Sequence, residues 1–316
     1  MQETIRIGEE GRQPVQVTHH KVVGRANRGK SAETLRLVAE ARARGVDVTL
    51  DQYPYTATST GTAALFPQSA QEGGAEGLRK RLADPTLRQQ IKAEVIHGIL
   101  HVRGAGDPAN VVMASCAFDP TLADKNLAEI TRARGRGPTV ENAAETAIEL
   151  EQQGGCSAIY HALSEEDLER ILKAPFTMVA SDGGIPVFGE GAPHPRNYGT
   201  FARILGRYVR ERKLLALEEA VRRMSALPAA RLGLWDRGQL RPGMKADIAL
   251  LDPDTVADRA TFQDPHQYAV GVRHVWVNGK AVLLDGVLTG ERPGRVLRGP
   301  GFQSSTVLSG SATSPR

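Results

Sequence analysis

The clearest alternation of apolar and polar positions lies near the start of the chain. Residues 14–21 read Pro-Val-Gln-Val-Thr-His-His-Lys, and this two-residue period predicts a strand. On that strand, His19 and Lys21 share the face of the two valines. His20 points to the opposite face, where we expect it to pack or form a hydrogen bond.

A helical pattern follows the first strand. Residues 31–41 carry apolar side chains three and four positions apart, Ser31 stands where an N-cap is expected, and Gly45 ends the helix. Residues 47–53 then show a second strand pattern. Strand, helix and strand in this order predict a βαβ unit with parallel strands and a right-handed crossover.

The middle of the chain departs from this alternation of strand and helix. It contains a charged helical stretch at 77–97 and a short apolar strand at 111–114. We expect residues 61–140 to form an excursion from the main architecture.

The second half of the chain returns to helical patterns and single strands. Helices are predicted over residues 141–153, 164–173, 201–213 and 217–233. Ser164, with Asp167 three residues later, gives the second of these a start that resembles a capping box. Residues 177–184 form a strand that runs into a glycine turn, and its alternation places Asp182 on the face of Met178.

The C-terminal region is rich in strand patterns. Residues 246–251 and 272–277 are predicted strands, and Asn278-Gly279 is a strong hairpin signal directly after the second of them. The serine-, glycine- and threonine-rich residues from 304 to 316 predict a disordered tail.

The charge of the chain is nearly balanced. Lysine and arginine total 40 against 36 aspartate and glutamate residues, and there is no sustained basic run. We therefore expect no nucleic-acid partner. Apolar runs stay far short of the roughly 18 residues of a transmembrane helix, and the first residues do not resemble a signal peptide, so we expect no membrane partner.

The chain has two cysteines, Cys116 and Cys156. Two widely spaced cysteines give neither a disulfide framework nor a paired metal-ligand spacing. We therefore expect a reduced, cytoplasmic protein.

Polar side chains end each of the three strands that belong to the strand–helix pattern. His19 with Lys21 follows the first, Asp51 with Tyr53 the second, and Asp182 the third. In a (β/α) barrel such groups converge across one mouth. A histidine and an aspartate that meet there are ligands for zinc, which activates a bound water at neutral pH.

Each of these residues also has a purely structural interpretation, which the pattern leaves open. His19 suits an ordinary strand histidine, and Asp182 suits a turn aspartate that bonds to its own backbone. Lys21 and Arg196 suit surface charges, and Tyr53 suits packing at a strand end.

Several motifs together resemble the N-acyl-D-amino-acid deacylase (D-aminoacylase) family of the amidohydrolase superfamily. The residues that carry the resemblance are Thr18-His19-His20-Lys21, Asp51-Gln52-Tyr53-Pro54-Tyr55, Ser59-Thr60-Gly61, Ser181-Asp182-Gly183, the stretch 194–201 that begins His194-Pro195-Arg196, and the stretches 237–248, 277–279 and 293–297. The resemblance covers residues 1 to about 298. The last three stretches are typical of many amidohydrolases, whereas the others are specific to the deacylases.

The resemblance implies an α/β fold, a metal-dependent (β/α)8 (TIM) barrel with a small β-sandwich, and zinc-dependent hydrolysis of N-acyl-D-amino acids. His19 and Asp182 match metal ligands, and Asp182 also matches the catalytic proton shuttle. Lys21, Tyr53, Ser59 and Arg196 match substrate-binding residues. Lys21 and Arg196 suit the substrate's α-carboxylate.

The chain departs from the family pattern at its beginning. Only eighteen residues precede His19, so the His-x-His motif and the cysteine ligand of the family are absent. The resemblance therefore implies an N-terminally truncated chain that supplies three of eight barrel strands. We expect a missing N-terminal half or a homo-oligomeric partner to complete it.

These expectations divide the chain into three regions, a partial (β/α) barrel domain over 1–235, a β-sandwich segment over 236–300 and a disordered tail over 301–316. Two alternatives to N-acyl-D-amino-acid deacylation stay open. One is hydrolysis of a cyclic amide, as in dihydroorotases and hydantoinases. The other is a non-catalytic fragment or partner subunit.

Overall fold

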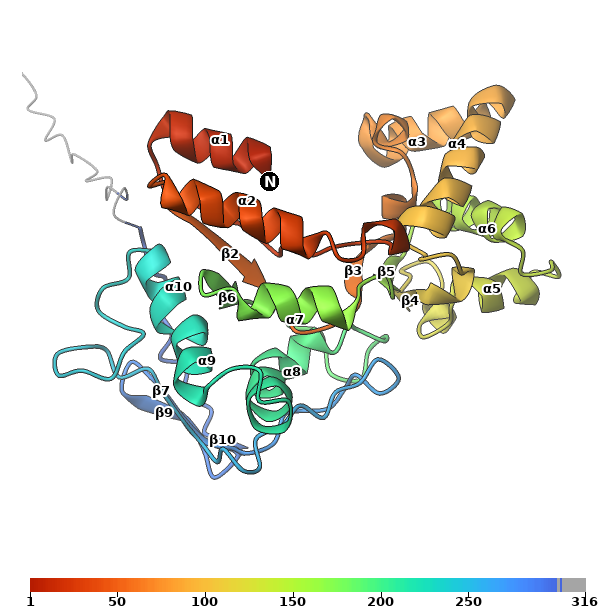
Figure 1. Ribbon diagram of the computed structural model, residues 1–316. Coiled ribbons are helices and arrows are strands. Elements are labelled where there is room, and N and C mark those ends of the chain that lie inside the picture. Colours follow the sequence, from red (N-terminus) through yellow and green to blue (C-terminus); the bar gives the residue numbers. More distant parts are fainter. Residues whose placement is uncertain (300–301, 303–316) are drawn as a thin grey trace, which may run out of the picture. The chain divides into compact units, whose positions relative to one another are not determined.

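A computed structural model describes residues 1–299 and 302, which form two compact units (Figure 1). The first comprises Met1–Met224 with Asp252–Gly271. The second comprises Ser225–Leu251 with the described residues from Val272 onward. The tail expected over 301–316 lies outside the described residues, apart from Phe302.

A three-stranded parallel sheet in the first unit carries the residues of interest. Its strands, in the order β1-β2-β6, are β1 (Val15–Val17), β2 (Val48–Gln52) and β6 (Thr177–Val179). The predicted βαβ unit and the α/β class are therefore confirmed. Because all three strands run in the same direction, their carboxyl ends meet at one edge.

Two of these strands are shorter than predicted. β1 ends at Val17, and His19 adopts a left-handed φ of 43° in the turn that follows. β6 ends at Val179, and Asp182 has a φ of 48°. A left-handed residue breaks the alternation of a strand. The predictions that His19 shares a strand face with Lys21, and Asp182 with Met178, are therefore wrong.

Three helices accompany the parallel sheet, namely α1 (Gln2–Gly11), α2 (Ser31–Ala43) and α7 (Glu165–Lys173). α1 was not predicted. Its buried Ile5 joins a core that includes Val15, Val38, Val48 and Leu50. α2 packs against both α1 and α7, as Figure 1 shows.

The start of α2 differs from the prediction. Lys30 occupies the N-cap position, and Ser31 is the first helical residue. The cap comes instead from Asp167 of α7, whose carboxylate accepts hydrogen bonds from the backbone of Gly29 and Ser31 and from the Ser31 hydroxyl. Burial raises the pKa of Asp167, but these hydrogen bonds and that of Ser164 outweigh it and lower the pKa. Ser164 caps α7 as predicted.

A second sheet in the first unit is antiparallel, with strand order β3-β5-β4. Its strands are β3 (Thr58–Gly61), β4 (Val111–Ser115) and β5 (Ser157–Tyr160). This sheet and the elements between its strands span residues 58–160, which include the stretch 61–140 predicted to depart from the main architecture. Helices α3 (Gly74–Ala83), α4 (Pro85–His97), α5 (Leu127–Ala133) and α6 (Val140–Gln152), and the π-helix η4 (Gly98–Val102), accompany it.

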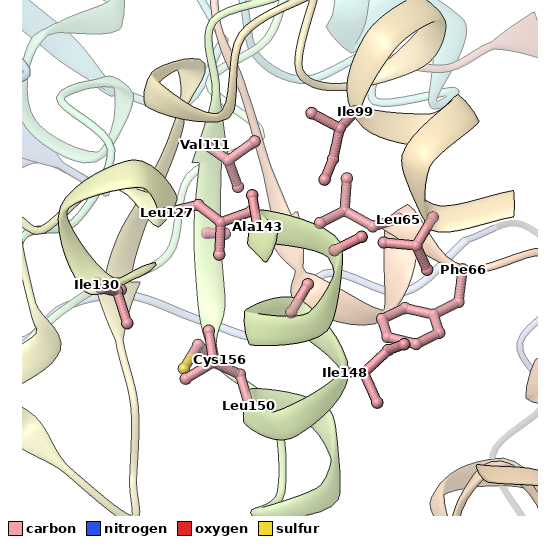
Figure 2. Close-up of a cluster of buried hydrophobic side chains, with 14 of the residues drawn as sticks. Leu65, Phe66, Ile99, Val111, Leu127, Ile130, Ala143, Ile148, Leu150 and Cys156 are labelled. Carbon is pink, nitrogen blue, oxygen red and sulfur yellow. The ribbon is translucent and has the colours of Figure 1, made fainter. Parts of the chain in front are cut away.

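A large apolar core fills this region (Figure 2). Val111 and Tyr160 of the sheet and Leu150 of α6 are among its fully buried members. The helix predicted at 77–97 is two helices, because Pro85 starts a new one and the Asp84 side chain caps it.

The two cysteines form a disulfide between Cys116 and Cys156. They stand where β4 ends and β5 begins, beside the paired residues Ser115 and Ser157. The prediction of a reduced protein without a disulfide is therefore wrong. Strand pairing brings together two residues that are 40 positions apart in the chain.

The remaining helices of the first unit are α8 (Arg196–Arg203), the π-helix η7 (Ile204–Glu211), which continues it, and α9 (Leu217–Met224). The predicted helix 201–213 thus begins five residues earlier, at Arg196. Short 3₁₀ helices lie at Arg25–Asn27, Thr62–Leu65, Gln68–Gln71, Pro108–Asn110 and Pro120–Leu122.

The second unit contains helix α10 (Ala226–Arg231) and an antiparallel sheet of order β10-β9-β8-β7. Its strands are β7 (Ile248–Leu251), β8 (Val272–Val277), β9 (Lys280–Leu284) and β10 (Val287–Leu288). Asn278 and Gly279 have φ values of 48° and 79° between β8 and β9, which confirms the predicted hairpin turn. Across the described part of the chain, every helix is too short or too polar to cross a membrane.

Candidate active site

The edge where the parallel strands end is organised by Asp51, a β2 residue. Its carboxylate accepts the backbone N–H of His19 at 2.6 Å and the Gln16 side-chain amide at 2.7 Å. The backbone N–H of His20 donates to the Asp51 carbonyl at 2.8 Å. Asp51 therefore holds the turn after β1 against the end of β2.

Tyr53 lies at the centre of a charged cluster. The Lys21 ammonium lies 5.2 Å from the centre of its ring, and the Arg196 guanidinium lies 4.8 Å from it. The Tyr53 side chain is buried, and burial raises the pKa of its hydroxyl. Arg196 lies close enough to this hydroxyl to oppose the rise in its pKa by charge and hydrogen bonding, although the hydroxyl makes no well-directed hydrogen bond among the described residues.

Lys21 has a depressed pKa. Burial is the main cause and lowers it from 10.5 to about 8, and the charges of Arg196 and Arg103 act in the same direction. Asp182 and Asp51 oppose the shift. Lys21 therefore titrates close to neutral pH.

Arg196 and Asp182 form an ion pair, with Nη1 and Oδ2 3.0 Å apart. The N–H groups on Nη1 and Nε of Arg196 are nevertheless not directed at any acceptor within residues 1–299 and 302. The distance between Nη1 and Oδ2 identifies an ion pair, whereas the direction of the N–H groups excludes a hydrogen bond. The contact is therefore electrostatic. The buried guanidinium thus keeps unsatisfied donors.

His194 positions Arg196 at the start of α8. The Arg196 backbone N–H donates to Nδ1 of His194 at 3.1 Å, and Nε2 lies 3.2 Å from the Ala57 carbonyl. These partners select the neutral tautomer with its proton on Nε2. Burial, with a contribution from Arg196, lowers the pKa of His194 from 6.5 to about 3. From the sequence, His194 was identified only as part of a motif or a loop. Its role in positioning Arg196 was therefore not predicted.

Ser59 lies on β3 and lines a cavity of about 660 Å³. His194 and Asn197 line the same cavity. Asn197 also accepts the backbone N–H of Gly184 at 2.9 Å, which ties α8 to the glycine turn after Asp182. Ser59 therefore shares this cavity with two residues that support the cluster, whereas the cluster residues Lys21, Tyr53, Asp182 and Arg196 are not among those that line it.

The histidines after β1 differ in burial. The His19 side chain is exposed, whereas His20 is buried and bonds to the Thr34 hydroxyl at 3.0 Å. His20 therefore has the packing role that was predicted. Within the described part of the chain, no three His, Cys, Asp or Glu side chains are grouped closely enough to hold a metal ion.

Comparison with known proteins places the chain in a family. The model of the amidohydrolase family matches residues 3–283. The chain is 39% identical over 297 residues to a D-aminoacylase of Alcaligenes xylosoxydans xylosoxydans, covering 94% of this chain and 51% of that protein. It is 38% identical over 296 residues to an N-acyl-D-glutamate deacylase of the same organism, covering 94% and 50%.

Solved structures agree with this relationship. A D-aminoacylase crystal structure superposes with a TM-score of 0.72 at 38% identity, covering 92% of this chain and 51% of that one. The N-acyl-D-glutamate deacylase of Bordetella bronchiseptica, complexed with zinc and a phosphonate inhibitor, gives 0.71 at 34% identity, covering 94% and 52%. The chain spans about half the length of the curated relatives it matches. It belongs to the amidohydrolase family, as its motifs predicted.

Proposed function

We propose that this chain supplies the substrate-binding and proton-transfer residues of a zinc-dependent N-acyl-D-amino-acid deacylase. The reaction would cleave the amide bond to give a carboxylate and a D-amino acid. The observation that carries the proposal is the cluster of Lys21, Arg196 and Asp182 around the buried Tyr53, beside the carboxyl ends of three parallel strands. The names of the relatives point to the same chemistry.

We further propose that the parallel sheet of β1, β2 and β6 supplies the last three strands of a (β/α)8 barrel. Their parallel order and the intervening helices support it. The antiparallel sheet of the second unit would then be part of a β-sandwich.

The unsatisfied donors of the cluster favour a carboxylate ligand. The Tyr53 hydroxyl and the Nε and Nη1 atoms of Arg196 are buried and make no well-directed hydrogen bond within the described chain. Such groups are costly unless a ligand satisfies them. The α-carboxylate of the substrate would accept from Arg196 and Tyr53, with Lys21 adding charge. Hydantoin, a cyclic amide without a carboxylate, offers no such anion.

Asp182 would move the proton. Its carboxylate stands at the same edge, and the ion pair with Arg196 fixes its position relative to the bound α-carboxylate. From there it would take a proton from the attacking water and deliver it to the leaving nitrogen. Ser59 would contact the substrate from the cavity beside His194.

The residues present do not fit a complete zinc site. A catalytic zinc takes three protein ligands. This chain offers His19 and Asp182, and no group of three donors occurs in residues 1–299 and 302. Further ligands would have to come from another segment or polypeptide. This observation favours a second candidate for the isolated chain, a non-catalytic partner subunit.

Calorimetric binding tests the proposal without requiring turnover. We expect N-acetyl-D-methionine to bind this chain, its L-isomer to bind at least about tenfold more weakly, and hydantoin not to bind. Arg196→Gln should weaken binding by about ten- to a hundredfold. Arg36→Gln, which removes an exposed arginine paired with Glu40 on α2, should leave it unchanged.

Turnover then separates the two candidates. Hydrolysis by the zinc-loaded chain alone would refute the partner-subunit role. Absence of binding by every N-acyl-D-amino acid would refute the deacylase proposal itself.

A further inference from the structure

We infer that Phe262 and Asp258 are positioning residues of this site, which hold Arg196 and Tyr53 in place without touching the substrate. Both lie in Asp252–Gly271, which stands between β7 and β8 in the sequence but belongs to the first compact unit. The inference rests on the proposed deacylase function and adds to it two residues outside the motifs that identify the family.

Close packing holds this segment against α8 and η7. A Cβ on Gly199 of α8 would stand 2.6 Å from the Tyr55 hydroxyl oxygen and 2.7 Å from the Cβ of Asp258. A Cβ on Gly206 of η7 would stand 2.7 Å from the Val256 carbonyl oxygen. Only glycine fits such short approaches, so both helices lie directly against the segment.

Phe262 packs on the histidine that positions Arg196. The ring centres of Phe262 and His194 are 5.0 Å apart, and their planes meet at 79°. Tyr55 packs edge-on against the same imidazole, with 5.3 Å between the ring centres. Nδ1 of this imidazole accepts the backbone N–H of Arg196. The two aromatic rings therefore limit the movement of the group that holds the start of α8.

Phe262 is itself held by buried residues. Its side chain is half-buried and packs against a small apolar cluster formed by Ala57, Ala114 and Ile159. Its ring also lies 4.7 Å from that of His161. Truncation of Phe262 would therefore leave unfilled space beside His194.

Asp258 acts on the chain that follows Tyr53. Its carboxylate, which is 12% exposed, accepts Nη1 of Arg203 at 2.9 Å. Nε of the same guanidinium donates to the Pro54 carbonyl at 2.8 Å, and the guanidinium lies 4.8 Å from the ring centre of Tyr55. Asp258 therefore orients the arginine that fixes the residue directly after Tyr53.

The two sets of contacts meet where the Arg196 guanidinium lies 4.8 Å from the ring centre of Tyr53. Phe262 restrains the Arg196 side of this contact, and Asp258 restrains the Tyr53 side. Since Arg196 would receive the α-carboxylate, loss of either restraint should weaken substrate binding in molecules that are still folded.

Calorimetry on this chain separates positioning from a purely structural role. Phe262→Ala should raise the Kd for N-acetyl-D-methionine by about three- to tenfold at an unchanged stoichiometry. Phe262→Leu, which refills much of the space, should recover most of the affinity. Asp258→Asn should raise the Kd by about two- to fivefold. A purely structural role would instead reduce the folded fraction, and hence the stoichiometry, at an unchanged Kd.

A double variant tests whether Phe262 acts through Arg196. In an Arg196→Gln background, Phe262→Ala should raise the Kd by less than about twofold, because the group that it positions is absent. The same increase in both backgrounds would overturn the positioning role of Phe262.

Two exposed residues of the same segment provide matched controls. Tyr268→Ala removes a ring that stacks on Phe188, and Asp264→Asn removes an exposed charge. Both should leave the Kd unchanged, and equal effects of controls and test variants would overturn the inference. A wild-type Kd in Phe262→Ala and Asp258→Asn would also overturn it and leave the deacylase proposal standing. Failure of the wild-type chain to bind any N-acyl-D-amino acid would overturn both.

Discussion

Arg196 and Asp182 lie 3.0 Å apart at the edge where β6 ends, although helix α8, which begins at Arg196, was predicted to start only at residue 201. The pair joins the proposed carboxylate-binding group to the proposed proton carrier. The ion pair fixes the two groups relative to each other, and substitutions at the two positions can test turnover and binding separately.

Asp182→Asn tests the proton-transfer role. Asparagine keeps the size of the side chain but cannot accept a proton at neutral pH, so kcat of the zinc-loaded enzyme should fall by about 10²- to 10⁴-fold. KM should change much less if Arg196 stays in place. Steady-state kinetics with N-acetyl-D-methionine measure both constants. A kcat within a few-fold of wild type would exclude Asp182 as the proton carrier.

Lys21 predicts a pH dependence of substrate binding. Its pKa in the free protein is lowered to about 8, so its positive charge is present below pH 8 and is lost as the pH rises through that value. KM should therefore increase above pH 8, by at most about tenfold per pH unit. Lys21→Gln should bind more weakly at pH 7 and lose this dependence. A wild-type KM that is flat from pH 7 to 10 would contradict the role of Lys21.

Protonation of His194 should lower the free energy of unfolding in acid. Its folded-state pKa of about 3 lies below the ordinary value of 6.5, so the unfolded chain binds the extra proton first. Its contribution is complete above pH 6.5 and is lost as the pH falls toward 3, by up to about 1.4 kcal/mol per pH unit.

Urea unfolding at several pH values, compared between wild type and His194→Gln, measures this slope. His20, whose pKa is lowered to about 4 chiefly by burial, contributes a similar slope that both proteins retain. The variant should show a shallower fall in unfolding free energy. Identical slopes in the two proteins would mean that His194 is protonated in the folded state.

The Cys116–Cys156 disulfide predicts redox-dependent stability. It closes a loop of 40 residues, so reduction should lower the free energy of unfolding by about 2–4 kcal/mol. The double variant Cys116→Ser/Cys156→Ser should be less stable than the oxidised wild type and insensitive to reductant. Thermal unfolding with and without reductant measures this. Thiol labelling of both cysteines in the folded, unreduced protein would contradict the disulfide.

The sequence correctly predicted local structural features that depend on a single short-range interaction. The βαβ unit follows from periods of two and then about 3.6 residues, and the hairpin follows from Asn278-Gly279, whose backbone accepts a positive φ. The cap at Ser164 depends on residues within one helical turn. The resemblance to the deacylases could also be recognised from the sequence alone, because it depends only on the motifs and their order.

Structural features that depend on long-range contacts were not predicted from the sequence patterns. Asp167 replaces Ser31 as the cap of α2 from a position 136 residues away, and strand pairing joins Cys116 to Cys156. The left-handed turns at His19 and Asp182 end their strands early, since a period of two cannot reveal where a strand stops. His194 gains its role only because the carbonyl of Ala57 lies next to it.

The amino-acid sequence by itself therefore determined the α/β class, the family and the residue types available for chemistry, because these depend on local periodicity and on motif identity. Only the tertiary structure decided which of those residues meet. The burial of Tyr53 and the positions of Lys21 and Arg196 beside its ring arise from segments that are far apart in the chain.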